Sequence, residues 1–279
     1  MKLLLVDGSN LLFQMFYGMP ARIQGKQGQP VHGTLGFLGA LLKVIRMTNP
    51  THAAVFFDGE HENPRTLVDE NYKANRPNFE GMSEQETPFS QLPDIFRCLN
   101  HLKIPYLETV DCETDDLVAA YAHAFGASME IGILSFDSDF FQLISDNVSV
   151  LRYRGKLTQR WDKRYLQERL GVEAEQYADY KSLTGDASDN IPGVPHVGPK
   201  TAAKLMHRFG SLDTLFAHLE EISQPALRTS LIENRERVIK NKALIRLDGA
   251  VPLPFSMESL AYIPTEKTSV QILRELDIL

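Results

Sequence analysis

The sequence has few cysteines and no long apolar run. It contains 279 residues, with two cysteines, Cys98 and Cys112, whose spacing is not that of a metal site. We therefore expect a reduced, cytoplasmic protein. No stretch approaches the roughly 18 apolar residues of a membrane helix. The start, MKLLLVDGSN, is too short an apolar run for a secretory signal because it already ends at Asp7.

Two common catalytic signatures are also missing. The sequence has no phosphate-binding GxxxxGK[ST] motif and no Ser–His–Asp set, and its histidines are scattered. The net charge is −7 with a pI near 5.6, which taken alone argues against nucleic acid. This argument is weak, because the distribution of charge matters more than the total. Carboxylates that bind metal cations lower the pI without repelling a phosphate once the metals are in place.

The apolar patterns that are present predict an α/β fold. Short apolar runs predict buried strands over residues 2–6, 53–57 and 131–136. Amphipathic patterns between them predict helices over 35–47, 92–102 and 117–125. This alternation favours a central, mostly parallel sheet flanked by helices.

The strand signals stop after about residue 161. The remaining patterns predict helices over 165–170, 175–183, 199–209 and 225–244. We therefore expect an α/β domain over residues 1–165 and a helical subdomain over residues 166–279.

A long polar connection interrupts the α/β pattern between about residues 59 and 88. Connections of this length are often functional or mobile. It contains NYKANRP, in which Tyr72 offers a stacking ring and Lys73 and Arg76 offer two phosphate contacts. Arg65 is a weaker candidate of the same kind. A solvated loop without a ligand remains the alternative.

Carboxylates recur where the predicted strands and helices begin or end. Asp7, Asp58 and Asp137 each follow a predicted strand, and ligands bind beyond the carboxyl ends of parallel strands, so we expect these three to converge. The other candidates are Glu113, Asp115, Asp116, Asp139, Asp186 and Asp189. Each of them alone could be an ordinary turn or cap residue.

Taken together, these carboxylates point to bound cations. Gathered in one crevice they would repel each other strongly unless cations neutralised them. Oxygen ligands without a His or Cys cluster favour Mg²⁺ or Mn²⁺ over zinc. Two such ions are a known arrangement for phosphodiester hydrolysis, in which one activates water and the other stabilises the leaving oxygen.

Two basic segments are candidates for phosphate contacts. In PGVPHVGPK, residues 192–200, Gly198 allows unusual backbone angles, and Pro199 fits the first position of a helix whose free N–H groups attract anions. Lys200 and Lys204 add charge. The alternative is an ordinary helix-packing turn. RYRGKLTQRWDKRY, residues 152–165, is either the polar face of an edge hairpin or a nucleic-acid contact.

Six motifs in the same order resemble those of a known family. VDGSN, FFDGE, YKANRP, ETDDL, DSDFFQL and GDASDNIPGV…GPKTA are similar to segments of the bacterial and phage 5′–3′ exonucleases. These enzymes are related to flap endonucleases and to the N-terminal nuclease domain of bacterial DNA polymerase I. The resemblance covers most of the chain and implies a PIN-like nuclease core followed by a helix–three-turn–helix element at about residues 184–210. It departs from the family pattern at Ser138, where a lysine is common, and at His196, where a glycine is usual.

The resemblance implies a role for each candidate residue. Asp7, Asp58, Glu113 and Asp115 would form one metal site, and Asp137, Asp139, Asp186 and Asp189 the other, with Asp115 and Asp116 near both. The catalytic residues would be Lys73, Arg76, Asp115 and Asp137. The DNA-binding residues would be Arg65, Tyr72, Lys73, Arg76, Gly198, Lys200, Thr201 and Lys204. Residues from about 60 to 88 would form an arch over a 5′ single strand, and K⁺ would bind the helix–three-turn–helix.

We therefore expect a structure-specific 5′ nuclease with two Mg²⁺ or Mn²⁺ ions. It would act as a monomer on branched or 5′-flap double-stranded DNA, in the cytoplasm of a bacterium and without a membrane partner. The chain ends at Leu279 with no room for a polymerase, so we expect a stand-alone nuclease. A non-catalytic binder of branched DNA and a PIN-type ribonuclease remain the alternatives.

Overall fold

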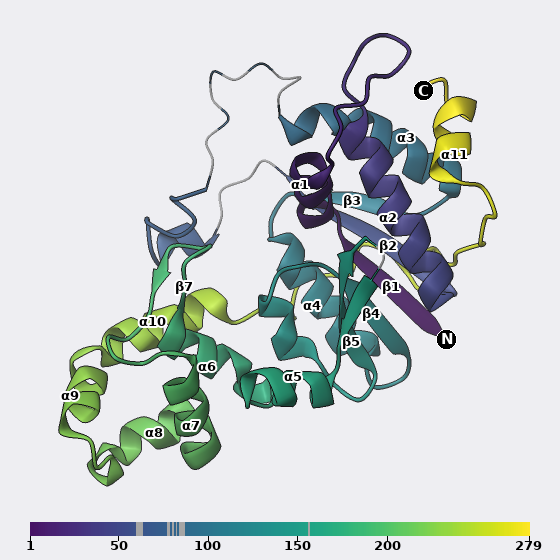
Figure 1. The fold of residues 1–279 in the computed structure, drawn as a ribbon. Helices are drawn as coiled ribbons and strands as arrows, with labels where there is room; N and C mark the ends of the chain where they lie inside the picture. The colour runs from purple at the N-terminus through teal and green to yellow at the C-terminus, as the bar shows by residue number, and fades with distance from the viewer. Residues whose placement is uncertain (60–63, 77–78, 80, 82, 84–86, 156) are drawn as a thin grey trace.

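A six-stranded sheet forms the centre of the larger of two lobes in the computed structural model (Figure 1). The structure describes residues 1–279 except 60–63, 77–78, 80, 82, 84–86 and 156. The strand order is β3-β2-β1-β4-β5-β6, with the first five strands parallel and β6 antiparallel to β5. The strands are β1 (Lys2–Asp7), β2 (His52–Asp58), β3 (Tyr106–Thr109), β4 (Glu130–Leu134), β5 (Val148–Arg154) and β6 (Leu157–Trp161). The predicted mostly parallel sheet is confirmed.

Helices cover both faces of the sheet. Successive residues of a strand point to opposite sides, so each strand contributes to both cores. In β1, Leu4 and Val6 belong to one core, and Leu3 and Leu5 belong to the other. The first core is closed by α1 (Gly8–Gly18), α2 (His32–Thr48), α3 (Leu92–Leu102) and α11 (Ser269–Glu275). The second is closed mainly by α4 (Thr114–Phe125) and by helices of the smaller lobe. This burial on both faces explains why the strands read as continuous apolar runs.

The smaller lobe is helical. It contains α5 (Lys163–Leu170), α6 (Tyr177–Thr184), α7 (Pro199–Phe209), α8 (Leu212–Ala217), α9 (Pro225–Glu233) and α10 (Arg235–Ile245). The single helix predicted over residues 225–244 is wrong, because the chain breaks at Asn234 with φ −108° and ψ 14°. The Asn234 side chain donates to the carbonyl of Ser230, a local bond that competes with continuation of the helix.

The chain after α10 returns to the larger lobe. Tyr121 of α4 donates its hydroxyl to the carbonyl of Phe255, and the backbone N–H of Ala53 in β2 donates to Leu260. Helix α11 then packs against α2 and α3 (Figure 1). The region predicted as a helical subdomain, 166–279, thus includes a tail that packs on the sheet lobe. Among the described residues, no helix has the length and apolar character needed to cross a membrane.

Candidate metal centre and nucleic-acid interface

The carboxyl ends of β1 and β2 bring the predicted carboxylates together. Asp7 caps α1 by accepting from the N–H of Asn10 at 3.0 Å, and the Ser135 hydroxyl donates to its other oxygen at 2.8 Å. Asp58 accepts from the N–H of Thr114 at 3.1 Å. Asp7, Asp58 and Asp137 all line one cavity of about 690 Å³, so their predicted convergence is confirmed.

The beginning of α4 adds three more carboxylates. Glu113 precedes the helix, and Asp115 and Asp116 lie in its first turn. One oxygen from each of the three lies within 4.8 Å of the others. Glu113 and Asp115 also line the cavity, whereas Asp116 accepts from the N–H of Asp248 in the returning tail at 2.7 Å. Asp116 therefore also ties α4 to the tail.

A second acidic group joins the two lobes. Asp139, Asp186 and Asp189 are buried, and one oxygen of each lies within 4.8 Å of the others. Asp186 is placed by a tight turn, in which Gly185 has φ +77° and a Cβ on it would come within 2.4 Å of the N of Gly193. Only glycine fits this position without a shift of the backbone.

The buried carboxylates resist ionisation. Burial raises the pKa of Asp7 to about 8, and the neighbouring Asp58 adds to the shift. Burial also raises the pKa of Asp115 to about 7, although Arg65 opposes the change. The pKa values of Asp137 and Asp139 are raised as well, mainly by burial. A site whose carboxylates resist ionisation is one that a cation would stabilise.

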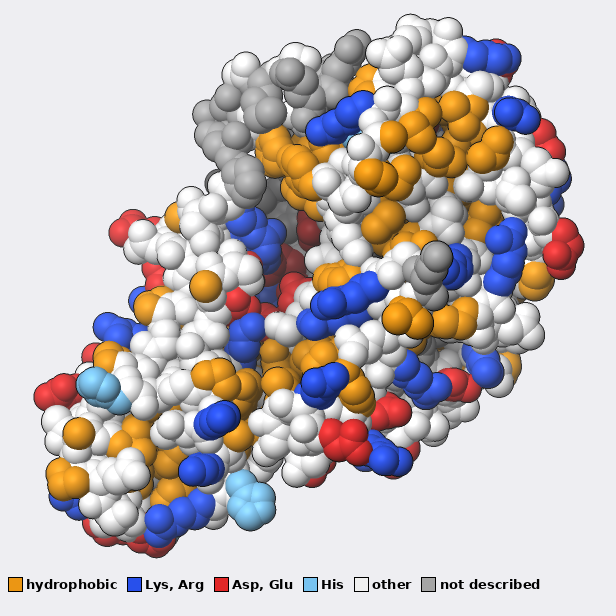
Figure 2. Space-filling model, in the orientation of Figure 1, with side chains coloured by type: hydrophobic (Ala, Val, Ile, Leu, Met, Phe, Trp, Pro, Cys, Tyr) orange, Lys and Arg blue, Asp and Glu red, His pale blue; other side chains and the backbone are white. Residues whose placement is uncertain are grey.

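Basic side chains face these carboxylates from the segment 65–76. Arg65 contacts Glu113 and lies 2.7 Å from an oxygen of Asp116, Lys73 contacts Glu113, and Arg76 lies 2.9 Å from an oxygen of Asp189. Figure 2 shows acidic and basic side chains gathered in the cleft between the two lobes. Lys73 and Arg76 also line the cavity.

Tyr72 and Arg65 are buried, whereas the sequence indicated that they were free to contact a ligand. Tyr72 is only 5% exposed and packs with Ile191 and Leu244, so its ring anchors the segment and offers little face to a base. Arg65 is 8% exposed, so its guanidinium neutralises carboxylates instead of standing free for a phosphate. Of the arch predicted over about 60–88, residues 60–63, 77–78, 80, 82 and 84–86 lie outside the described residues.

An aromatic cluster at the cavity was not anticipated from the sequence. Phe13, Phe79 and Phe89 all line the cavity, and their ring centroids lie 5.4 to 5.9 Å apart in edge-on pairs. Phe89 remains 45% exposed. Phe13 is far from the other two residues in the sequence, so only the fold brings it to them.

The turn before α7 has the predicted helix start but a different special residue. Helix α7 begins at Pro199, as expected, and Lys200 and Lys204 are exposed. Gly198 has an ordinary φ of −85°, so the turn does not use the unusual backbone angles that a glycine allows. The left-handed residue is His196, with φ 68°, a conformation that His tolerates better than most residues. Thr201 is half-buried in the first turn of α7.

The other basic segment forms an edge hairpin. β5 and β6 pair antiparallel, with Arg152 opposite Gln159 and Arg154 opposite Leu157. Part of the basic character is internal, because the Arg152 guanidinium donates to the carbonyl of Phe136 and lies over the Phe141 ring. Lys156 of this segment lies outside the described residues.

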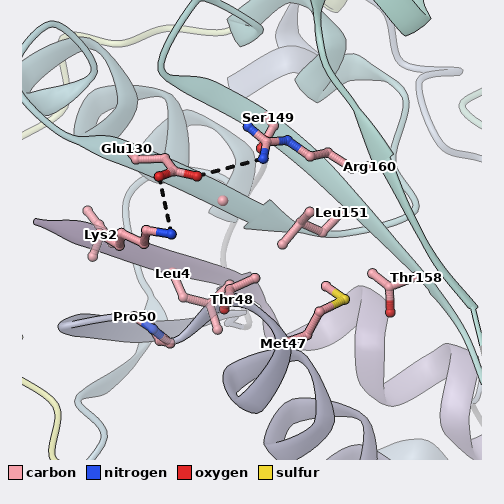
Figure 3. A pocket seen from close by; sticks show the side chains of 12 residues that line it. Lys2, Leu4, Met47, Thr48, Pro50, Glu130, Ser149, Leu151, Thr158 and Arg160 are labelled. Atoms are coloured by element: carbon pink, nitrogen blue, oxygen red, sulfur yellow. Dashed lines mark ion pairs between the residues drawn. The ribbon is translucent and has the colours of Figure 1, made fainter.

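A second cavity, of about 240 Å³, lies at the opposite end of β1 from Asp7 (Figure 3). Its floor includes Leu4 and Leu151. Glu130 lies 3.4 Å from the Lys2 ammonium and 3.7 Å from the Arg160 guanidinium. Its lone carboxylate is thus already paired, and we assign this cavity no chemistry.

The chain is also similar to known proteins over almost all its length. DNA polymerase I of Rhizobium leguminosarum is 34% identical over 271 residues, which are 94% of this chain and 26% of the relative. DNA polymerase I of Bacillus subtilis is 32% identical over 267 residues, which are 94% of this chain and 29% of the relative. The chain therefore spans less than a third of the length of these relatives.

Two solved structures share the fold. The T5 D15 protein co-crystallised with metal ions has a TM-score of 0.74 at 22% identity, covering 98% of this chain and 99% of that chain. The catalytic core of Rad2 in complex with DNA substrate has a TM-score of 0.62 at 15% identity, covering 98% and 86%. At these identities the likeness shows the fold alone.

Two family descriptions match consecutive parts of the chain. Residues 2–171 match the N-terminal resolvase-like domain of 5′-3′ exonucleases, and residues 172–268 match their C-terminal SAM fold. The motifs that carried the resemblance thus lie in a chain that matches both domains in the family order. The chain belongs to the 5′-3′ exonuclease family.

Proposed function

We propose that this protein is a metal-dependent 5′ nuclease that hydrolyses DNA near junctions of single strand and duplex, as a 5′-3′ exonuclease, a flap endonuclease or both. The observation that carries the proposal is the cavity at the carboxyl ends of β1 and β2. Six carboxylates line it together with Lys73 and Arg76, beside a second buried acidic group. Membership of the exonuclease family supports it, as do two structural relatives, one co-crystallised with metal ions and one in complex with DNA substrate.

The residues present fit divalent cations. The donors are oxygens, and buried Asp139 has one carboxylate oxygen without a hydrogen-bond partner among the described residues. We propose that Asp7, Asp58, Glu113 and Asp115 hold one ion and that Asp137, Asp139, Asp186 and Asp189 hold the other. When bound, Mg²⁺ or Mn²⁺ would supply charge stabilisation and a more acidic water. Asp116 would act indirectly, through its contacts with the Arg65 guanidinium and with the N–H of Asp248 in the tail.

Lys73 and Arg76 would orient the scissile phosphate. Both line the cavity that holds the carboxylates, and both are tied to acidic partners that a phosphate and its cations would replace. The backbone fixes their position, because the N–H of Lys73 donates to the carbonyl of Asp189 at 3.0 Å. A phosphodiester held by two cationic side chains has its charge partly neutralised before water attacks.

The surfaces beside the cavity suit both parts of a branched substrate. Phe13, Phe79 and Phe89 present aromatic faces on which unpaired bases can stack. The N-terminus of α7 with Lys200, Thr201 and Lys204 suits the phosphates of a duplex. We propose that K⁺ joins the protein to the duplex at this turn, and that the protein acts as a monomer.

The test is cleavage of a 5′-labelled flap duplex and a nicked duplex with Mg²⁺, Mn²⁺ or EDTA. We expect metal-dependent products that disappear with Asp137→Asn and persist with Asp146→Asn, a matched change at an exposed carboxylate. Product sizes separate endonuclease from exonuclease activity. Tight binding of the flap without cleavage under either metal would refute the proposal and make the protein a non-catalytic DNA binder, and cleavage of RNA alone would make it a ribonuclease.

A further inference from the structure

A lysine of the smaller lobe lies inside the second acidic group. The Lys181 ammonium, from α6, is 2.6 Å from an oxygen of Asp186 and 3.9 Å from an oxygen of Asp139. It also donates to the hydroxyl of Ser138 at 2.9 Å. Its side chain is 13% exposed. Lys181 therefore reaches two of the three carboxylates that form the group.

The contacts of this group are unequal. Asp186 has its charge balanced, since burial would raise its pKa but Lys181 beside it holds the pKa below the usual value. Asp139 is 6% exposed, and its Oδ1 has no hydrogen-bond partner among the described residues, because Lys181 stays 3.9 Å away. Arg76 pairs with Asp189 from the side of the cavity, so Lys181 is the cation that the smaller lobe itself supplies to the group. The unpartnered oxygen of Asp139 leaves acceptor capacity for a further cation.

We propose that Lys181 is a built-in counter-cation that limits the divalent-metal affinity of the site formed by Asp139, Asp186 and Asp189. The inference rests on the proposed function in one respect, that this group binds a divalent ion. It adds a residue that tunes the site without being a ligand, since an ammonium has no lone pair to give.

The physical reason is repulsion between like charges inside a buried site. An ammonium within 4 Å of two ligand carboxylates shares their charge and repels any ion that they hold. The backbone of Lys181 is held in place because α6 packs against both α7 and α10. The bond from its ammonium to the Ser138 hydroxyl, at 2.9 Å, also holds the side chain at the group.

The same lysine supports the fold before metal arrives. Without it, Asp186 and Asp139 would be left buried near each other with no opposing charge from α6. Lys181 thus lets the two lobes close around the acidic group in the metal-free protein. The consequence is a site that is assembled in advance but binds its ion weakly.

The test is Mn²⁺ binding to the full chain without DNA, followed by the electron paramagnetic resonance of free Mn²⁺. The variants are Lys181→Met, Lys181→Gln, which can still bond to Ser138, and Lys181→Arg, which keeps the charge. Asp186→Asn identifies which binding step belongs to this group. Lys242→Met is the matched control, because Lys242 pairs with buried Asp179 in the same lobe at 2.7 Å but outside the group.

The Mn²⁺-binding step that disappears in Asp186→Asn identifies this group. We expect its affinity to rise at least about tenfold in Lys181→Gln and Lys181→Met, because both changes remove a positive charge within 4 Å of two ligand carboxylates. Lys181→Arg and Lys242→Met should bind as the wild type does. Unchanged or weaker Mn²⁺ binding in both neutral variants would overturn the inference while leaving the proposed function standing. If neither the wild type nor the neutral variants bind Mn²⁺, the proposed function and the inference are overturned together.

Discussion

Replacing Asp7 by Asn should stabilise the metal-free protein, and increasingly so as the pH rises. Asp7 is 7% exposed, and its pKa in the folded protein is about 8, against 3.8 for a free side chain. A raised pKa means that the folded state favours the protonated form. Its contribution to stability is therefore present at low pH and is lost as the pH rises from about 4 to about 8.

The size of the effect follows from the shift. Between about pH 5.5 and about pH 8, ionising Asp7 lowers the free energy of unfolding of the wild type by about 3 kcal/mol. Asn cannot ionise, and it still accepts from the N–H of Asn10 as an N-cap. The advantage of Asp7→Asn over the wild type should therefore grow by about 3 kcal/mol between these two conditions.

The assay is urea unfolding in EDTA, followed by circular dichroism at both pH values. Asp146→Asn serves as the control for loss of a negative charge, because the Asp146 side chain is 87% exposed. An advantage of Asp7→Asn that stays the same at both pH values would refute the buried-charge argument. Adding Mg²⁺ should make the wild type more stable than Asp7→Asn, since an ion that binds only the folded wild type stabilises it by mass action.

Three further predictions concern the phosphate site, the duplex surface and the lobe packing. Lys73→Met should lower kcat for flap cleavage at least about tenfold, because it removes one of two cations at the phosphate; an unchanged kcat in single-turnover assays would exclude Lys73 from the chemistry. Replacing Lys200 and Lys204 together by Met should reduce the slope of log affinity against log KCl by about 2, since two phosphate contacts are lost. Fluorescence anisotropy measures this slope, and equal slopes in the wild type and the double variant would show that Lys200 and Lys204 do not contact DNA phosphates. Asn241→Leu should lower the free energy of unfolding by about 2 kcal/mol, because the carbonyls of Ser182 and Pro192 lose their donor. A midpoint in urea equal to that of the wild type would contradict this reading.

The sheet and the placement of the carboxylates could be predicted because both depend on local pattern. Apolar runs that end in aspartate, such as those at Asp7 and Asp58, indicate buried strands whose carboxyl ends meet. The strand β3 escaped prediction because its four residues, Tyr106–Thr109, carry no continuous apolar run. The break at Asn234 escaped because a helical period can continue through a residue whose side chain caps the helix before it.

Of the cations inside the acidic groups, Lys181 could not be predicted. Lys73 and Arg76 stood out because they share a short motif, but Lys181 is one lysine in an amphipathic helix. Only the packing of α6 against the sheet lobe brings it to Ser138 and Asp139. The burial of Arg65 and Tyr72 likewise depends on contacts with α4 and α10 that are distant in sequence.

The returning tail makes the helical lobe an insertion within the sheet lobe. The chain passes from the sheet lobe to the helical lobe between β6 and α5, and it returns after α10 on its way past α4 to β2. The segment 65–76 is a further link, because the N–H of Lys73 donates to the carbonyl of Asp189 and the Lys240 ammonium lies 2.8 Å from an oxygen of Asp69. The acidic cleft therefore cannot open fully while these contacts of the segment 65–76 remain. A cut in the tail would remove one covalent link and leave the segment 65–76 to hold a larger share of the lobe contact.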